Sequence, residues 1–200
     1  GAGEGAAFHA AAPEWVFQCM IQDFGVRQEN FASPFNCYFS RFNSAFPDTD
    51  VPFGSLGSFF EFHPTSGSFE TGPPYTEEVI ELMADRLELL LSSSDLPLSF
   101  MVYVPNWVDP LAAGLATMNC SRFNRSDFVI KGSEYSYVIG HQHRGSVNNG
   151  PGRYFVLPMD TRIYFLQNDA GAERWPITEE KVAKLRDNLL RNKIAPFNMG

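Results

Sequence analysis

The sequence predicts an α/β protein whose mostly parallel sheet carries an antiparallel hairpin at one edge. Strand and helix patterns alternate along the first half of the chain, which is the order of a parallel sheet with helical crossovers. Residues 98–104 form a nearly continuous apolar run, as expected of a strand that is covered on both faces. The second half is richer in strand patterns, and this predicts the hairpin there.

The first half is expected to begin with two helices. Residues 13–24 open with a proline, carry apolar residues at helical spacing and are followed by a glycine. Aromatic residues then recur at steps of three and four through residues 38–46, which predicts a second helix. Residues 51–72 have the composition of a loop, and a short strand is expected to end with residues 68–71.

The strongest helix pattern follows a turn made of residues 72–75. Thr76 is a suitable N-cap, because its hydroxyl can accept a hydrogen bond from a free N–H of the first turn. Glu77 and Glu78 suit the positive end of the helix dipole. An apolar stripe follows, and the polar residues 92–95 end the helix.

The rest of the chain is expected to hold a short helix, four strands and a final helix. Asp109 and Pro110 have the order of a cap followed by the first residue of the short helix. The final helix is expected to start at Thr178. The four strands are expected at residues 127–131, 134–139, 153–157 and 162–167.

Length and composition indicate a single core over residues 1–200, with residues 1–12 flexible and residues 177–200 forming a C-terminal helix and tail. Of the 200 residues, 44% are hydrophobic and 19% are charged, which argues against wholesale disorder. The net charge of −8 disfavours a protein that coats nucleic acid by bulk electrostatics. A local basic groove stays compatible with that charge.

Nothing in the sequence points to a membrane or secreted protein. It has no run of about 18 apolar residues, and its first residues lack the basic and apolar parts of a signal peptide. The scattered cysteines Cys19, Cys37 and Cys120 give no disulfide framework, so an intracellular, reducing compartment is favoured. Because the chain starts without methionine, it is interpreted as a fragment or a processed product.

Two segments are candidates for a ligand site, because ligands of open parallel sheets bind beyond the carboxyl ends of the strands. They are residues 31–36 and residues 72–75. The double proline of the second segment fixes the backbone and leaves both carbonyl oxygens as acceptors. An adenine could stack on Tyr75 while a carbonyl accepts a hydrogen bond from its amine. The alternative interpretation is a turn that only leads into the helix.

Longer strings follow one another in order along the chain. They are Phe31-Ala32-Ser33-Pro34-Phe35-Asn36-Cys37-Tyr38-Phe39, Ser44-Ala45-Phe46-Pro47-Asp48-Thr49-Asp50, Phe53-Gly54-Ser55, Gly67-Ser68-Phe69-Glu70, Pro97-Leu98-Ser99-Phe100, Val104-Pro105 with Trp107, and Phe165-Leu166-Gln167-Asn168-Asp169. Together they resemble one family, the phosphorylated-CTD-interacting-factor family of cap-specific adenosine N6-methyltransferases. The resemblance covers roughly residues 13–176 and implies a Rossmann-like catalytic domain that binds S-adenosylmethionine. It also implies methylation of N6 on a 2′-O-methyladenosine next to an mRNA cap.

The resemblance assigns the site residues. The catalytic turn would be Gly72, Pro73, Pro74 and Tyr75, with Gly72 in place of the family's Asn and Tyr75 in place of its Phe. The cofactor side would consist of Ala32, Ser33, Pro34 and Asn36, together with Asp48 and Asp50 of an acidic loop. Asn106 stands where the family commonly has an acidic residue before Trp107.

RNA contacts are expected from the locally basic middle of the chain. Arg122 and Arg125 can reach phosphates, and His141 and His143 fall where the family has a Gln-His pair. The two histidines could also suggest a metal ion, but no further ligand stands at a recognisable spacing, so no metal site is predicted. The alternative for each of these residues is a solvated surface.

Three functional hypotheses follow from these observations. The first is an active adenosine N6-methyltransferase that acts on capped mRNA. The second is an inactive relative that binds RNA or other protein subunits in a ribonucleoprotein, for example as an assembly factor, because Gly72 lacks the catalytic side chain. A DNA adenine methyltransferase shares the chemistry but not the longer strings. The resemblance implies a nuclear location, and a mitochondrial one is the alternative.

Overall fold

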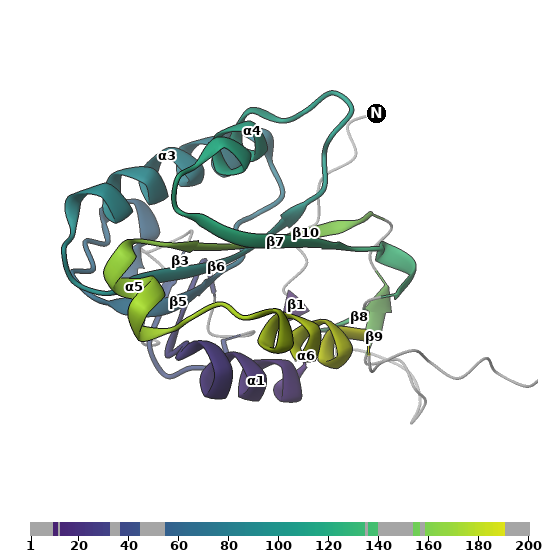
Figure 1. Ribbon diagram of the computed structural model, residues 1–200. Helices are drawn as coiled ribbons and strands as arrows, with labels where there is room; N and C mark the ends of the chain where they lie inside the picture. The colour runs from purple at the N-terminus through teal and green to yellow at the C-terminus, as the bar shows by residue number, and fades with distance from the viewer. Residues whose placement is uncertain are drawn as a thin grey trace, which may run out of the picture.

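The computed structural model describes residues 10–11, 13–32, 37–44, 55–134, 136–139, 154–156 and 159–190 (Figure 1). Within them the chain forms a seven-stranded sheet that lies between two layers of helices. Across these ranges, no helix combines the length and the apolar character that crossing a membrane requires.

The sheet has the strand order β4-β3-β2-β5-β6-β10-β7. Neighbouring strands pair in parallel from β4 to β6, whereas β10 is antiparallel to both β6 and β7. This confirms the predicted parallel sheet with an antiparallel edge. The strands are β2 (Gln28–Asn30), β3 (Phe42–Ser44), β4 (Ser55–Ser58), β5 (Gly67–Thr71), β6 (Leu98–Pro105), β7 (Asn124–Ile130) and β10 (Thr161–Gln167).

A second, smaller sheet has the antiparallel order β1-β8-β9. Its strands are β1 (Ala10–Ala11), β8 (Ser136–Ile139) and β9 (Tyr154–Val156). The strands predicted at 134–139 and 153–157 are therefore present, but they belong to this sheet and not to the main one.

Helices cover both faces of the main sheet. Figure 1 shows α3 (Glu77–Ser93) and α4 (Ala113–Cys120) on one face, and α1 (Glu14–Phe24) and α6 (Glu179–Leu190) on the other. The short α5 (Asp169–Arg174) follows β10, and two 3-10 turns lie at Phe59–Glu61 (η2) and Gly132–Glu134 (η3). The side chain of Thr76 accepts a hydrogen bond from the Val79 N–H, so this predicted cap is confirmed.

The core is organised by β6, all eight residues of which are buried. Phe100 and Val102 point into the apolar cluster beneath α3 and α4. Met101 and Tyr103 point into the cluster beneath α1 and α6, because successive side chains of a strand alternate between its faces. Two covered faces explain why this strand reads as a continuous apolar run.

The helix predicted over residues 38–46 is wrong. Residues 42–44 are the strand β3, and the described residues before it, 37–41, are not helical. Two of the aromatic residues that suggested a helix, Tyr38 and Phe39, pack instead against α1, where Tyr38 stacks on Phe17 with 4.6 Å between ring centroids. The pairing of β3 with β2 and β4 decides the conformation of this segment, although its aromatic residues recur at helical spacing.

The short helix also begins later than predicted. Asp109 and Pro110 form a turn between Val108 and Leu111, which are joined by an isolated bridge, and α4 starts at Ala113. A cap followed by a proline is equally compatible with a tight turn, and here the bridge fixes that outcome. The sequence analysis missed β1, β2, β4 and α5, all of which are short, and β4 lies within the segment 51–72 that was predicted to be a loop.

Asn168 connects the amino end of the sheet to the helices around it. Its Oδ1 accepts hydrogen bonds from the Leu98 N–H at 3.1 Å and the Gly171 N–H at 2.8 Å. Its Nδ2 donates to the carbonyl oxygens of Ser94 and Leu96, each at 2.8 Å. One buried side chain therefore caps α5, holds the start of β6 and fixes the segment that leaves α3.

We expect Asn168→Ala to lower the free energy of unfolding by roughly 2–4 kcal/mol, since it removes a cap and leaves buried backbone groups unpaired. Urea unfolding followed by circular dichroism measures this loss. Gln18→Ala is the control, because Gln18 is exposed and contacts only Glu14 within its own helix. Equal stabilities of the two variants would contradict the assigned role of Asn168.

Candidate functional site

The order in which the chain adds strands to the main sheet reverses between β2 and β5. After β2 it adds β3 and β4 on one side, and it then returns to place β5 and β6 on the other side. Such a switch point opens a crevice beyond the carboxyl ends of the two central strands. Here those ends are joined by a buried hydrogen bond of 3.0 Å from Asn30 Nδ2 to Thr71 Oγ1. The segments that begin at residues 31 and 72 therefore leave the sheet side by side.

The segment after β2 bends sharply at its first residue. Phe31 has a φ of 64°, which is uncommon for a residue other than glycine. Its ring packs on Phe59 with 4.6 Å between centroids. Ala32, predicted on the cofactor side, is buried, and its N–H donates to the Asn43 carbonyl oxygen at 2.9 Å.

The turn at residues 72–75 leads into α3 and also presents an acceptor. The Pro74 carbonyl oxygen accepts the Thr76 N–H at 2.9 Å. Among the residues that the structure describes, none donates a hydrogen bond to the Pro73 carbonyl oxygen. Pro74 thus serves the entry into the helix, and the role of this turn in holding an adenine stays a prediction.

Gly72 has no side chain, and the Glu70 side chain lies beside the space that a side chain at position 72 would enter. A Cβ at position 72 would lie 3.0 Å from Glu70 Oε1. Residues 70 and 72 project to the same side, because side chains alternate along a strand. The Glu70 carboxylate therefore lies where a side chain at position 72 would begin.

Glu70 has a second carboxylate, Glu29, as its direct neighbour on β2. Glu29 is only 4% exposed, and its Oε2 accepts the N–H groups of Tyr38 at 2.6 Å and Phe39 at 3.0 Å. Burial raises the pKa of Glu29 from 4.5 to about 7, although these two donors act in the opposite direction. Burial, followed by the charge of Glu29, raises the pKa of Glu70 well above its usual range.

Other buried acceptors lie at the same edge of the sheet. Asn30 Oδ1, at the end of β2, and Asn106 Oδ1, just beyond β6, accept no hydrogen bond from the described part of the chain. The Asn106 N–H donates to the Asp160 carbonyl oxygen at 2.8 Å. With Pro73 and Glu70, these atoms give the crevice several open acceptors, which suits a ligand that carries N–H and O–H donors or a positive charge.

Seven predicted site residues lie outside the described residues, so their roles stay predictions. They are Ser33, Pro34, Asn36, Asp48, Asp50, His141 and His143. The described parts of the chain contain no group of three or more His, Cys, Asp or Glu residues that could hold a metal ion.

The structure places Arg122 and Arg125 at the amino ends of the parallel strands, the edge opposite to residues 72–75. Arg125 donates to the Gln167 carbonyl oxygen at 3.1 Å and pairs with Asp169 at 2.7 Å. The Arg122 guanidinium lies 4.6 Å from the centre of the Phe123 ring. Their contact with RNA stays a prediction. It would require an RNA that extends from residues 72–75 to the opposite edge of the sheet.

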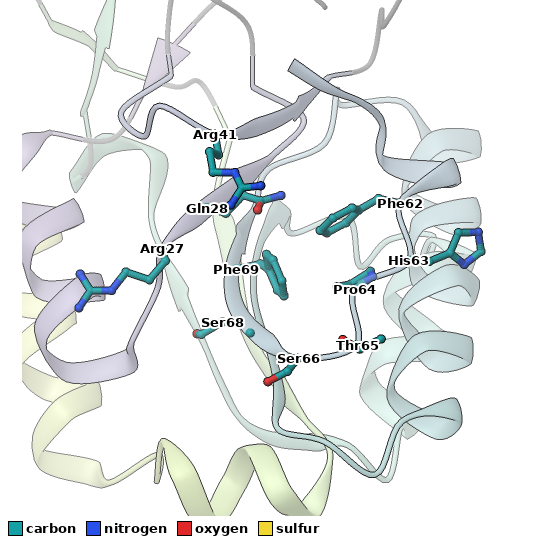
Figure 2. Close-up of a pocket in the computed structure, with 11 residues that line it drawn as sticks. Arg27, Gln28, Arg41, Phe62, His63, Pro64, Thr65, Ser66, Ser68 and Phe69 are labelled. Atoms are coloured by element: carbon teal, nitrogen blue, oxygen red, sulfur yellow. The ribbon is translucent and has the colours of Figure 1, made fainter. Parts of the chain in front are cut away.

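A cavity of about 460 Å³ also lies at the amino edge (Figure 2). Figure 2 shows the rings of Phe62 and Phe69 turned toward it, with Gln28 and Arg41 along one side. Because it opens beside the first residues of β2 and β5, it does not include the turn at residues 72–75. The cavity is thus separate from the predicted site.

The sequence analysis missed the acidic pair Glu29 and Glu70 as functional residues. Glu70 belongs to one of the strings that resemble the family, and this was the signal in the sequence that could have pointed to a functional role for it. Glu29 lies on a polar strand of three residues, where composition gives no sign of burial. Only the parallel register brings the two carboxylates together.

Comparison with known proteins gives three similarities. A family model described as "Phosphorylated CTD interacting factor 1 WW domain" matches residues 1–140. Two curated relatives, from Homo sapiens and Mus musculus, are named mRNA (2'-O-methyladenosine-N(6)-)-methyltransferase, and each is 41% identical to this chain over 182 residues. The alignments take up 91% of this chain and 25% of each relative, so the chain spans about a quarter of the length of these relatives.

The family description names a WW domain, but the matched segment has a different structure. It contains the parallel strands β2 to β6 and the helices α1, α3 and α4. The match therefore describes the α/β core of this chain.

The raised pKa of Glu29 predicts that stability falls as the pH rises. The folded chain keeps the proton up to pH about 7, whereas the unfolded chain loses it near 4.5. Between these values each pH unit lowers the free energy of unfolding by about 1.4 kcal/mol. We expect Glu29→Gln, which mimics the protonated side chain, to remove a decrease on the order of 2–3 kcal/mol between pH 5 and 7.5.

Urea unfolding of both proteins at pH 5, 6, 7 and 7.5 measures this difference. Glu61→Gln, at an exposed position on η2, is the control and should keep the slope of the unsubstituted chain. Parallel stability profiles for the unsubstituted chain and Glu29→Gln would show that the Glu29 carboxyl is not held in its neutral form.

Proposed function

Since the chain belongs to the phosphorylated CTD interacting factor 1 family, we propose that it is the catalytic core of an RNA adenosine N6-methyltransferase. Its substrate would be capped mRNA that begins with 2′-O-methyladenosine, and its methyl donor S-adenosylmethionine. The observation that carries this proposal is the open carbonyl oxygen of Pro73 at the carboxyl end of β5, beside the switch point of the sheet.

The crevice fits a methyl donor of this kind. S-adenosylmethionine has an ammonium group, ribose hydroxyls and an adenine amine, all of which need acceptors. The buried Asn30 Oδ1, which accepts no hydrogen bond from the described residues, lies at the end of β2, where an open α/β sheet binds such ligands. Ala32, Ser33, Pro34 and Asn36 would form the turn on the cofactor side, and Asp48 and Asp50 of the acidic loop would help to hold the cofactor. The sulfonium of the bound donor supplies an electrophilic methyl group.

The turn at residues 72–75 would hold the target adenine. Its amine is a poor nucleophile, because the lone pair is delocalised into the ring. A hydrogen bond from one amine hydrogen to the Pro73 carbonyl oxygen favours the pyramidal geometry that attack requires. Tyr75 offers an aromatic face for stacking, and the rigid prolines fix the distance between this face and the carbonyl.

A second candidate function follows from Gly72. The loss of one positioned hydrogen-bonding group in a catalytic site costs about two to three orders of magnitude in rate. The second candidate is therefore an inactive subunit that binds RNA or protein in a ribonucleoprotein. In either case RNA is the expected partner, and the naming of the relatives as mRNA-modifying enzymes supports an intracellular, nuclear location. The alternative of a mitochondrial location gains no support from them.

The deciding experiment combines calorimetry with methyl transfer. We expect micromolar binding of S-adenosylmethionine and S-adenosylhomocysteine, and transfer to N6 of capped RNA that begins with 2′-O-methyladenosine but not with guanosine. Tyr75→Ala should lower transfer about 10- to 100-fold, because a stacked base is worth about 1–3 kcal/mol. Leu82→Ala, on the exposed side of α3, is the matched control.

The two candidates differ in their outcomes. Cofactor binding without transfer to any adenosine-starting RNA would favour the inactive subunit. Absence of binding at millimolar cofactor, in a chain shown to be folded, would contradict the enzyme.

A further inference from the structure

We propose that the Glu70 carboxylate is the second acceptor for the N6 amine of the target adenosine, in the place that a side chain at position 72 would otherwise take. This inference rests on the proposed function and deepens it. It makes Glu70, which is part of a string shared with the family, a catalytic residue that still offers an acceptor where Gly72 has none.

The first argument is position. Glu70 projects from β5 on the same side as Gly72, and its Oε1 lies 3.0 Å from the point where a Cβ at position 72 would be. Its carboxylate therefore reaches past Thr71 to the level of the turn. Pro73 follows Gly72 directly, and no described residue donates a hydrogen bond to its carbonyl oxygen. The Glu70 carboxylate and the Pro73 carbonyl oxygen thus belong to one segment of four residues at the carboxyl end of β5.

The second argument is the lack of a partner. Glu29 uses its carboxylate to hold two backbone N–H groups, whereas no described residue donates a hydrogen bond to Glu70. No cation is paired with it in the described part of the chain. Within the described part of the chain, the half-buried Glu70 carboxylate thus has acceptor capacity that an N–H from a ligand could use.

The third argument is chemical complementarity. The N6 amine has two hydrogens, and two acceptors are needed to draw both away from the ring plane. Burial and the charge of Glu29 raise the pKa of Glu70 and so favour its protonated form, which keeps one carbonyl oxygen as an acceptor. Because the interaction is a hydrogen bond, it needs no additional reactant.

The test is whether the protein recognises the N6 amine through Glu70. Two capped RNAs would be compared in the presence of S-adenosylhomocysteine, one starting with 2′-O-methyladenosine and the other with the matching purine nucleoside, which lacks the amine. The unsubstituted chain should bind the adenosine RNA about 10-fold more tightly. Glu70→Ala should reduce this preference to less than about twofold, and Glu70→Gln, which keeps one acceptor, should retain part of it.

Glu180→Ala, at an exposed position in the first turn of α6, is the control and should keep the full preference. Thermal unfolding checks that each variant is folded, and Glu70→Gln, which keeps the shape of the side chain, decides the case if Glu70→Ala unfolds. Binding of both RNAs with equal affinity by the unsubstituted chain would overturn the role of Glu70 and leave the proposed function standing. Failure to bind either cofactor or RNA would overturn the proposed function itself.

Turnover gives a second measure, through a double-mutant cycle. As a single substitution, Glu70→Ala should lower kcat about 100- to 1,000-fold. In a chain that also carries Gly72→Asn, the same change should lower kcat less than about 10-fold, because the introduced amide supplies the acceptor. Equal losses in both backgrounds would show that Glu70 does not act in place of a side chain at position 72.

Discussion

The parallel pairing of β2 with β5 is the constraint on which the candidate site depends. Its register sets Glu29 beside Glu70 and Asn30 beside Thr71. In the first pair, burial raises the pKa of both carboxyls, and the charge of Glu29 raises the pKa of Glu70 further. The second pair joins the strands by a buried hydrogen bond. A shift by one residue would turn each of these side chains to the other face of the sheet. The surrounding apolar clusters, above and below β6, keep that register in place.

The same pairing gives the crevice its chemical character. Four acceptors lie there, the Pro73 carbonyl oxygen, the Asn30 and Asn106 amide oxygens and the Glu70 carboxylate, and none of them accepts a hydrogen bond from the described residues. Unpaired buried acceptors lower stability, so donors from a ligand would stabilise this edge of the sheet. Under the proposed function, the ammonium group of the methyl donor and the exocyclic amine of the base would be such donors.

Much of the fold could be predicted from sequence, because β6 and α3 have strong local patterns. The strands β2 and β3 could not, since each has three residues, and pairing with neighbours decides their conformation rather than propensity. For the site, the rule that ligands bind beyond the carboxyl ends of parallel strands indicated residues 31–36 and 72–75. The resemblance then gave these residues their expected roles, and chain topology brought their described parts together. The roles of Glu29 and Glu70 required the register, because an isolated glutamate in a sequence is normally a solvated surface residue.

The position of β10 has a consequence for how the protein is made. This strand lies between β6 and β7 but is encoded after both of them. On the ribosome, β6 therefore emerges with one edge unpaired, and it stays so until about sixty further residues have been added and the chain has folded back. During this interval a strongly apolar segment exposes free backbone groups, so the nascent chain is vulnerable to aggregation until β10 arrives.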